Sequence, residues 1–201
     1  MSSTVQAPKV VRLGECASVA WRNGAGNTRV MAQDPADAAY DDFSWRVSLA
    51  EIARSGPFSS FAGVQRQFVA LGEHGLTLTV DGRPHPLSMF DTISFPGEAK
   101  TSCDLPAGVT ASALNVMARA GWATAEITML TDVAGIELVA PARGHLLVVA
   151  LEAGCTADGV GELGRLDAIW CREGHRLRAT AVGRLLVVTF HSREGDGGGR
   201  E

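Results

Sequence analysis

The chain has 201 residues, of which 46% are hydrophobic and 20% charged, and its formal net charge is -4 at pH 7. This length can bury the core of one large domain or of two small ones. A mildly acidic chain without a run of Lys or Arg argues against nucleic acid as a partner. The longest apolar run, residues 146–151, is far shorter than the roughly 20 residues of a membrane helix, which argues against a membrane.

The first residues and the cysteines indicate a reducing compartment. The start, MSSTVQAPKV, has neither the basic residues nor the apolar block of a signal peptide. The cysteines lie far apart and form no C-x-x-C pair, which is typical of buried, reduced thiols. We therefore expect a cytoplasmic protein with free thiols at Cys16, Cys103, Cys155 and Cys171.

Short strands separated by turn signals dominate the chain. The stretch WRVSLAEI (45–52) places Arg46 and Ser48 on one face and Trp45 and Val47 on the other. Similar stretches follow at 66–71, 76–80, 92–95, 109–117, 125–130, 136–140, 145–151, 165–170, 175–182 and 184–190. Because no long amphipathic helix interrupts them, the sequence predicts an all-β fold.

The strands fall into two halves of similar number, divided by a seam near residues 119–124. This rhythm predicts two small barrels or sandwiches, one over residues 1–120 and a smaller one over 121–191. The glycine-rich, charged tail 192–201 is expected to be disordered. The segment PADAAYDD (35–42) is expected to be a loop, with a helical turn as the alternative.

The most unusual stretch is WRNGAGNTRV (21–30), a polar corner kinked by two glycines. Glycines permit positive φ, and Asn side chains can bond to their own backbone in such a corner. One interpretation is a structural corner in which Trp21 caps a core. The other is a rim segment that points Asn23 and Thr28 into the mouth of a barrel.

Three further features carry candidate site chemistry. If both faces of the 45–52 strand are buried, Arg46 points inward and needs an anionic partner; otherwise it lies on the solvent face. The loop segment SGPFSSFAGVQRQF (55–68) delivers Arg66 onto the next strand, and its Phe58 and Phe61 form either a lid or plain core. Asn115 lies in an apolar strand, where a buried amide needs a hydrogen-bond partner.

The histidines form no metal-binding pattern. None belongs to H-x-H or H-E-x-x-H, and the sequence contains no P-loop, G-x-G-x-x-G or G-x-S-x-G. We therefore expect no metal and no cofactor.

Together the segments resemble the HutD/Ves family. The resemblance rests on WRNGAGNTR (21–29), DFSWRVSLAEIARSGPFSSFAGVQRQFVAL (42–71), FPG (95–97) and LNVMAR (114–119), in family order. It implies a bicupin fold, two cupin-like β-barrels packed together, without metal histidines. The polar positions that it implies for ligand binding are Trp21, Asn23, Thr28, Arg46, Ser48, Arg66 and Asn115.

The resemblance also implies a function. Arg46 and Arg66 would clamp a small carboxylate such as urocanate or formylglutamate, in a non-catalytic protein that senses or buffers an acid of histidine utilisation. Two acids frequent in the family are replaced here, by Val30 and Ala113, which either makes the pocket more cationic or leaves an arginine unpaired without a ligand. The resemblance then implies either a ligand that differs from that of typical members or a copy that has lost the function. The alternatives are a metal-independent isomerase or lyase of cupin type, which needs a general base near the clamp, and a structural scaffold. Exposed edge strands favour a homodimer.

Overall fold

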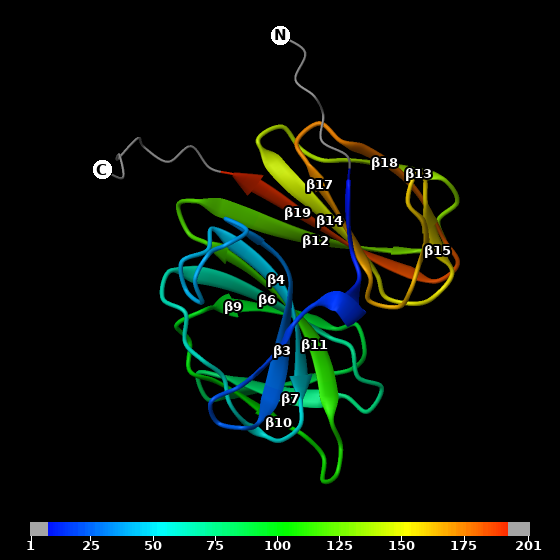
Figure 1. The fold of residues 1–201 in the computed structure, drawn as a ribbon. Coiled ribbons are helices and arrows are strands. Elements are labelled where there is room, and N and C mark those ends of the chain that lie inside the picture. The colour runs from blue at the N-terminus through cyan, green and yellow to red at the C-terminus, as the bar shows by residue number, and fades with distance from the viewer. Residues whose placement is uncertain (1–7, 193–201) are drawn as a thin grey trace. The chain divides into compact units, whose positions relative to one another are not determined.

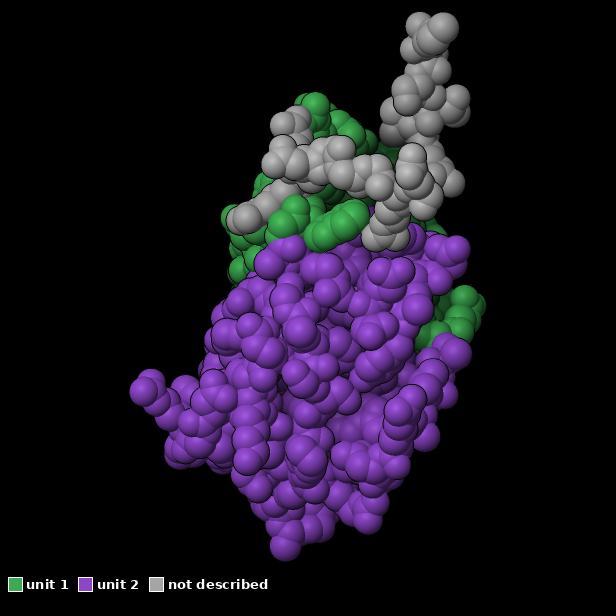
Figure 2. All heavy atoms as spheres, turned by 90° about the vertical axis from the view of Figure 1, so that its left-hand side faces the viewer, with its two compact units in different colours: residues 1–16, 121–201 green, residues 17–120 purple. Residues whose placement is uncertain are grey.

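The computed structural model describes residues 8–192, and the chain divides into two compact units (Figures 1 and 2). Unit 1 comprises Met1–Cys16 and Gly121–Glu201, and unit 2 comprises Ala17–Ala120. Apart from one 3-10 turn, η1 (Leu13–Glu15), the regular elements of the described residues are strands, which confirms the predicted all-β class. Within residues 8–192 no helix has the length and apolar character that crossing a membrane requires.

Unit 2 contains two antiparallel sheets. The six-stranded sheet has the order β2-β3-β4-β11-β6-β9, and the four-stranded sheet has the order β5-β10-β7-β8. The strands are β2 (Ser18–Ala20), β3 (Gly26–Asp34), β4 (Trp45–Ile52), β5 (Gly56–Pro57), β6 (Val64–Ala70), β7 (Leu76–Val80), β8 (Arg83–Leu87), β9 (Thr92–Pro96), β10 (Thr101–Asp104) and β11 (Ala111–Arg119). Asp81 and Gly82, both at positive φ, form the two-residue turn between β7 and β8.

The core of unit 2 lies between its two sheets. Ala50 and Ile52 of β4 and Phe68 of β6 pack with Leu78 and Cys103 of the other sheet. Side chains alternate along a strand. Arg46 and Ser48 therefore share the inner face of β4 with Ala50 and Ile52.

Unit 1 is also a pair of antiparallel sheets, in the orders β1-β17-β14-β19-β12 and β13-β18-β15-β16. Its strands are β1 (Lys9–Val11), β12 (Ala123–Thr131), β13 (Ile136–Val139), β14 (Gly144–Ala150), β15 (Cys155–Ala157), β16 (Gly161–Leu163), β17 (Ala168–Arg172), β18 (Arg176–Ala181) and β19 (Arg184–Ser192). The core cluster, which includes Leu146, Val148 and Ile169, consists of apolar side chains and cysteines.

The predicted closed barrels are not observed in residues 8–192. A barrel closes only when its first and last strands pair. In unit 2 the larger sheet ends at β2 and β9 and the smaller at β5 and β8, and the sheets of unit 1 likewise have free ends. The end strands β2 and β5 have three and two residues, which leaves few backbone groups to join one sheet to the next.

The first described segment differs from the expected boundary at residue 120. β1 pairs with β17, so residues 8–16 lie with unit 1 and not with the N-terminal half. Asp167 holds this segment in place: it accepts hydrogen bonds from Arg12 Nη1 (2.7 Å) and from the backbone N–H groups of Leu13 and Gly164 (3.0 Å each). The predicted disordered tail lies outside the described residues from 193 onward.

Asp167→Asn is expected to lower the free energy of unfolding by about 1–3 kcal/mol at pH 7, because the charge-assisted bonds from Arg12 and the two N–H groups weaken. Burial by itself would raise the pKa of Asp167, but these hydrogen bonds outweigh burial and lower it. A carboxyl with a lowered folded-state pKa stabilises the protein above its unfolded pKa of about 3.9, and this contribution is lost as the pH falls.

Denaturant unfolding of the wild type and of Asp167→Asn between pH 7 and pH 3 measures this difference in the free energy of unfolding. The difference between wild type and variant should be largest at pH 7 and should shrink as the pH falls below about 3.9, because the Asp167 carboxyl of the unfolded chain then binds a proton before that of the folded protein does. A difference that stays constant over this range would contradict the assignment.

No disulfide links the four cysteines, all of which lie within the described residues. Cys103, Cys155 and Cys171 are fully buried, and burial raises the pKa of Cys103 to about 12 and that of Cys171 to about 11. Such thiols fill core space and are poor nucleophiles. Cys16 is only partly buried.

Candidate functional site

Four of the predicted site residues meet on the inner face of the six-stranded sheet of unit 2. β11 lies between β4 and β6, and the register places Met117 opposite both Arg46 and Arg66. One step along, Asn115 is opposite Ser48. All four polar side chains are buried: Arg46 is 5% exposed, Ser48 2%, Arg66 3% and Asn115 5%.

The Arg46 guanidinium has few polar partners. Its Nη1 donates to the Tyr40 carbonyl oxygen (2.7 Å), and its Nη2 lies 3.8 Å from the Met117 sulfur. Aromatic rings provide the remaining surroundings. The guanidinium carbon lies 4.4 Å from the ring centre of Phe43, 5.2 Å from that of Tyr40 and 5.3 Å from that of Phe61.

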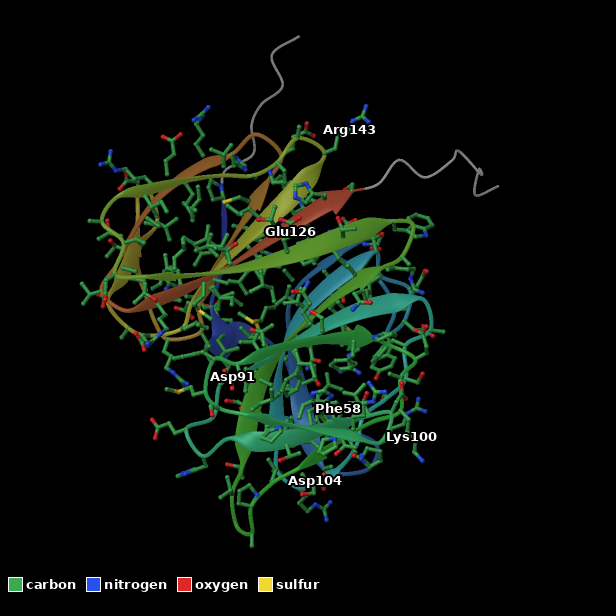
Figure 3. The ribbon with its side chains drawn as sticks, turned by 180° about the vertical axis from the view of Figure 1, so that it is seen from behind. Phe58, Asp91, Lys100, Asp104, Glu126 and Arg143 are labelled. Carbon is green, nitrogen blue, oxygen red and sulfur yellow. The ribbon has the colours of Figure 1, made fainter. Side chains whose placement is uncertain are left out.

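Arg66 has a similar environment. Its Nη2 donates to Asn115 Oδ1 (2.8 Å), and its Nη1 donates to the Ser59 carbonyl oxygen (3.2 Å). The rings of Phe58, Phe61 and Phe95 have their centres 5.0–5.6 Å from its guanidinium carbon. Phe61 therefore contacts both guanidiniums. Figure 3 shows Phe58 among the strands of the unit, whereas Lys100 and Asp104 lie toward its periphery.

No carboxylate pairs with either guanidinium in the described part of the chain, and the Nε atom of each has no hydrogen-bond partner there. Burial lowers the pKa of Arg46, with Tyr40 opposing. Burial also lowers the pKa of Arg66 to about 10; Tyr40 opposes this shift and the nearby charge of Arg46 adds to it. Both groups stay charged at neutral pH, so two like charges lie buried together, which is unfavourable without an anion.

A small apolar cluster lies beside this polar group and is separate from the main core of unit 2. It contains Phe43, Phe61, Val64 and Met117, with Ala38 packed against it. Its phenylalanines come from two segments without regular structure, the 35–44 loop and the 58–63 loop. The loop predicted at 35–42 is therefore confirmed. In the 58–63 loop, Phe61 is buried and its ring lies beside both guanidiniums.

The position of the 58–63 loop explains the glycine of the FPG stretch. The Gly97 N–H donates to the Val64 carbonyl (2.6 Å), and the Phe61 N–H donates to the Gly97 carbonyl (2.8 Å). A Cβ on residue 97 would lie 2.4 Å from the Phe61 carbonyl oxygen. Only glycine fits where the loop approaches β9 this closely.

The WRNGAGNTRV corner contributes support around the site and places none of its polar side chains on a guanidinium. Trp21 Nε1 donates to Thr28 Oγ1 (2.7 Å), and the Trp21 ring packs edge-on against Phe58 (5.7 Å between ring centres). Asn23 is exposed; its Oδ1 accepts from the Ala25 N–H (3.0 Å), and its Nδ2 donates to the Pro57 carbonyl (3.4 Å). These contacts agree with the structural interpretation of the corner.

The corner also contains the start of a strand that the sequence pattern did not predict. β3 begins at Gly26, where a Cβ would lie 2.3 Å from the Glu51 carbonyl oxygen of β4.

Of the two positions that lack the family's acids, Val30 is 36% exposed, whereas Ala113 is fully buried opposite Ala50 and Ala70. On the inner face of the sheet, the three neighbouring positions next to Asn115 and Ser48 are therefore all alanines.

The sequence reasoning missed Tyr40, Phe43, Met117 and Arg119. Alternation along β11 could have found two of them, because Met117 and Arg119 follow Asn115 at steps of two and share its face. Tyr40 and Phe43 lie in or beside a stretch expected to be a loop, where spacing gives no orientation. In residues 8–192 no group of three or more His, Cys, Asp and Glu side chains is arranged to hold a metal ion.

The facing antiparallel sheets define an all-β protein, and unit 2 buries two guanidiniums on the inner face of its larger sheet. The chain belongs to the HutD family, whose model matches residues 14–187. It is 41% identical over 101 residues to an uncharacterised 21.2 kDa protein in the hutC 3' region of Pseudomonas putida, which covers 50% of this chain and 53% of that protein. It is 38% identical over 100 residues to protein Ves of Citrobacter koseri, covering 49% and 51%. The matched segments thus span about half the length of these relatives.

Solved structures extend the likeness over the whole fold. A structure of HutD from Pseudomonas fluorescens SBW25 superposes with a TM-score of 0.80 at 28% identity, over 93% of this chain and all of that one. Protein Ylba of E. coli superposes with a TM-score of 0.70 at 10% identity, over 96% of each chain, and shows the fold alone. Both the Pseudomonas putida relative in the hutC 3' region and the Pseudomonas fluorescens HutD thus carry a hut designation.

Proposed function

We propose that unit 2 binds a small organic acid between Arg46 and Arg66, and that the protein senses or buffers an acid of histidine utilisation. The observation that carries the proposal is the pair of buried guanidiniums without a carboxylate partner in the described residues. A carboxylate accepts two parallel hydrogen bonds from an arginine fork and neutralises its charge. Asn115 already bonds Arg66, and Ser48 lies opposite Asn115 on the neighbouring strand, so we assign their amide and hydroxyl the role of orienting such a ligand.

Binding is favoured over acid–base catalysis by what contacts the guanidiniums. A metal-independent isomerase or lyase needs a general base within hydrogen-bond reach of its substrate. The groups that contact Arg46 and Arg66 are backbone carbonyls, an amide, a thioether and aromatic rings. An assay with the same acids, followed for turnover, tests the enzyme alternative directly.

Thermal unfolding with added acids tests the proposal. Urocanate, formylglutamate, glutamate, histidine and formate should be titrated into the wild type, Arg66→Ala, Arg66→Lys and the exposed control Arg54→Ala. A ligand that binds only the folded state adds roughly 2.7 kcal/mol at 100 times its Kd. We expect a dose-dependent rise in Tm in the wild type and in Arg54→Ala, a smaller rise in Arg66→Lys, which keeps the charge without the fork, and no rise in Arg66→Ala.

The response to formate, whose only titratable group is its carboxyl, should not change between pH 6 and pH 9. Arg66 has a pKa of about 10 and stays charged over this range, and the carboxyl groups of the ligands are ionised. If an acid stabilises Arg66→Ala as much as the wild type, or if none of them stabilises the wild type, the proposed anion site is wrong.

A further inference from the structure

The two loops that cover the guanidinium pair are joined by one side chain, that of Arg119 at the end of β11. Its Nε donates to the Phe43 carbonyl (3.1 Å) and its Nη2 to the Asp41 carbonyl, both in the 35–44 loop. Its Nη1 donates to the Ala62 carbonyl in the 58–63 loop (3.2 Å). A single guanidinium thus holds backbone groups of both loops.

The backbone at the end of β11 fixes the far end of each loop. The Arg119 N–H donates to the Ser44 carbonyl, and the Ala120 N–H donates to the Gly63 carbonyl (2.8 Å each). Between these fixed ends, rings of the two loops contact each other: Tyr40 and Phe61 have their centres 5.3 Å apart, and Phe43 and Phe61 6.1 Å. The Arg119 side chain adds a polar link, because its hydrogen bonds reach both loops.

We propose that Arg119 is a positioning residue that latches these two loops closed over Arg46 and Arg66, and that a ligand enters when the latch opens. At 5% and 3% exposure neither guanidinium can be reached by a carboxylate while the rings cover it. The acceptors at Asp41 and Ala62 belong to exposed residues, so water can replace Arg119 there during opening. The cluster around Phe61 is separate from the main core, so the part of the 58–63 loop that carries Phe61 can open while Phe58, which packs against the main core, stays in place.

The inference rests on the proposed anion site for what enters, but the latch can be tested without any ligand. Phenylglyoxal modifies accessible arginines, and mass spectrometry gives the rate at each one. In the wild type Arg46 and Arg66 should react slowly and the exposed Arg54 rapidly. Because modification of a transiently opened site follows the population of the open form, Arg119→Ala should raise the rates at Arg46 and Arg66 together, by about tenfold or more.

Arg54→Ala is the matched control, since Arg54 also donates to a loop carbonyl, that of Gly24 (2.8 Å), but away from the two covering loops. It should leave both rates unchanged. Arg119→Lys keeps the charge but loses the forked guanidinium that bonds both loops, so it should raise both modification rates by a smaller factor. This variant also provides the test if Arg119→Ala fails to fold. Wild-type rates in the folded Arg119 variants, or a rise at only one of the two arginines, would overturn the latch.

Hydrogen exchange of the wild type with and without acetate separates the latch from the proposed function. If the site binds a carboxylate, exchange in residues 35–44 and 58–63 should slow in both loops by a similar factor. Slowing in one loop alone would contradict a shared latch. Unchanged exchange in both, together with the expected phenylglyoxal rates, would support the latch and count against the anion site.

Discussion

Arg46→Met is expected to unfold at a higher temperature than the wild type without ligand, and to lose the response to carboxylates. The guanidinium is 5% exposed and has no carboxylate partner in the described residues. Replacing buried charge with an apolar side chain of similar size is often stabilising. A methionine would lie among Tyr40, Phe43, Phe61 and Met117, and the Tyr40 carbonyl that loses its donor belongs to an exposed residue, where water can replace it.

The expected gain is roughly 1–2 kcal/mol, or about 2–8 °C in Tm for a chain of this size. Differential scanning calorimetry with and without urocanate measures both effects. Arg29→Met is the matched control, because Arg29 lies 3.4 Å from the Glu51 carboxylate and its removal should bring no gain. A fall in the Tm of Arg46→Met would instead show that Arg46 serves the fold, as in a structural scaffold.

Asn115→Asp is expected to weaken carboxylate binding by at least about tenfold while raising the Tm of the free protein, since a bonded charge pair inside a protein is worth more than a neutral contact. Asn115 Oδ1 already accepts from Arg66 Nη2 at 2.8 Å, so the change places a carboxylate against the guanidinium with almost no change in shape. The new carboxylate takes the place of the ligand and neutralises half of the site.

Calorimetric titration gives the affinity, and thermal unfolding gives the stability. Gln65→Glu adds the same charge at an exposed position on the same strand as Arg66 and should leave both unchanged. The stabilisation of Asn115→Asp should also disappear in acid, where the new carboxyl is protonated. Unchanged affinity in Asn115→Asp would show that the ligand does not use the Arg66 fork.

The strand pattern predicted much of the fold and part of the site. Alternation in WRVSLAEI matched β4, Trp45–Ile52, and put Arg46 and Ser48 on one face. It could not tell which face was inside. That depends on the second sheet, whose strands β7 and β10 supply the opposing core residues Leu78 and Cys103.

The convergence of Arg66 and Asn115 could not be derived from spacing, because it depends on the strand order β4-β11-β6 and its register. β3 was missed because the Gly and Asn residues at its start are typical of turns; Gly26 is in a strand because the Glu51 carbonyl occupies the space of its side chain. The prediction of closed barrels was wrong because the periodicity within a strand carries no information on whether the last strand of a sheet pairs with the first.

The charged groups and the aromatic rings of the site come from different kinds of element. Arg46, Arg66 and Asn115 stand on neighbouring strands inside a sheet, whereas most of the rings belong to the 35–44 and 58–63 loops. Loops accept substitutions and insertions more readily than the strands they connect. Under the proposed function, descendants of this fold can therefore change which acid they prefer by altering these loops, while the buried guanidiniums that attract the acid are inherited with the sheet.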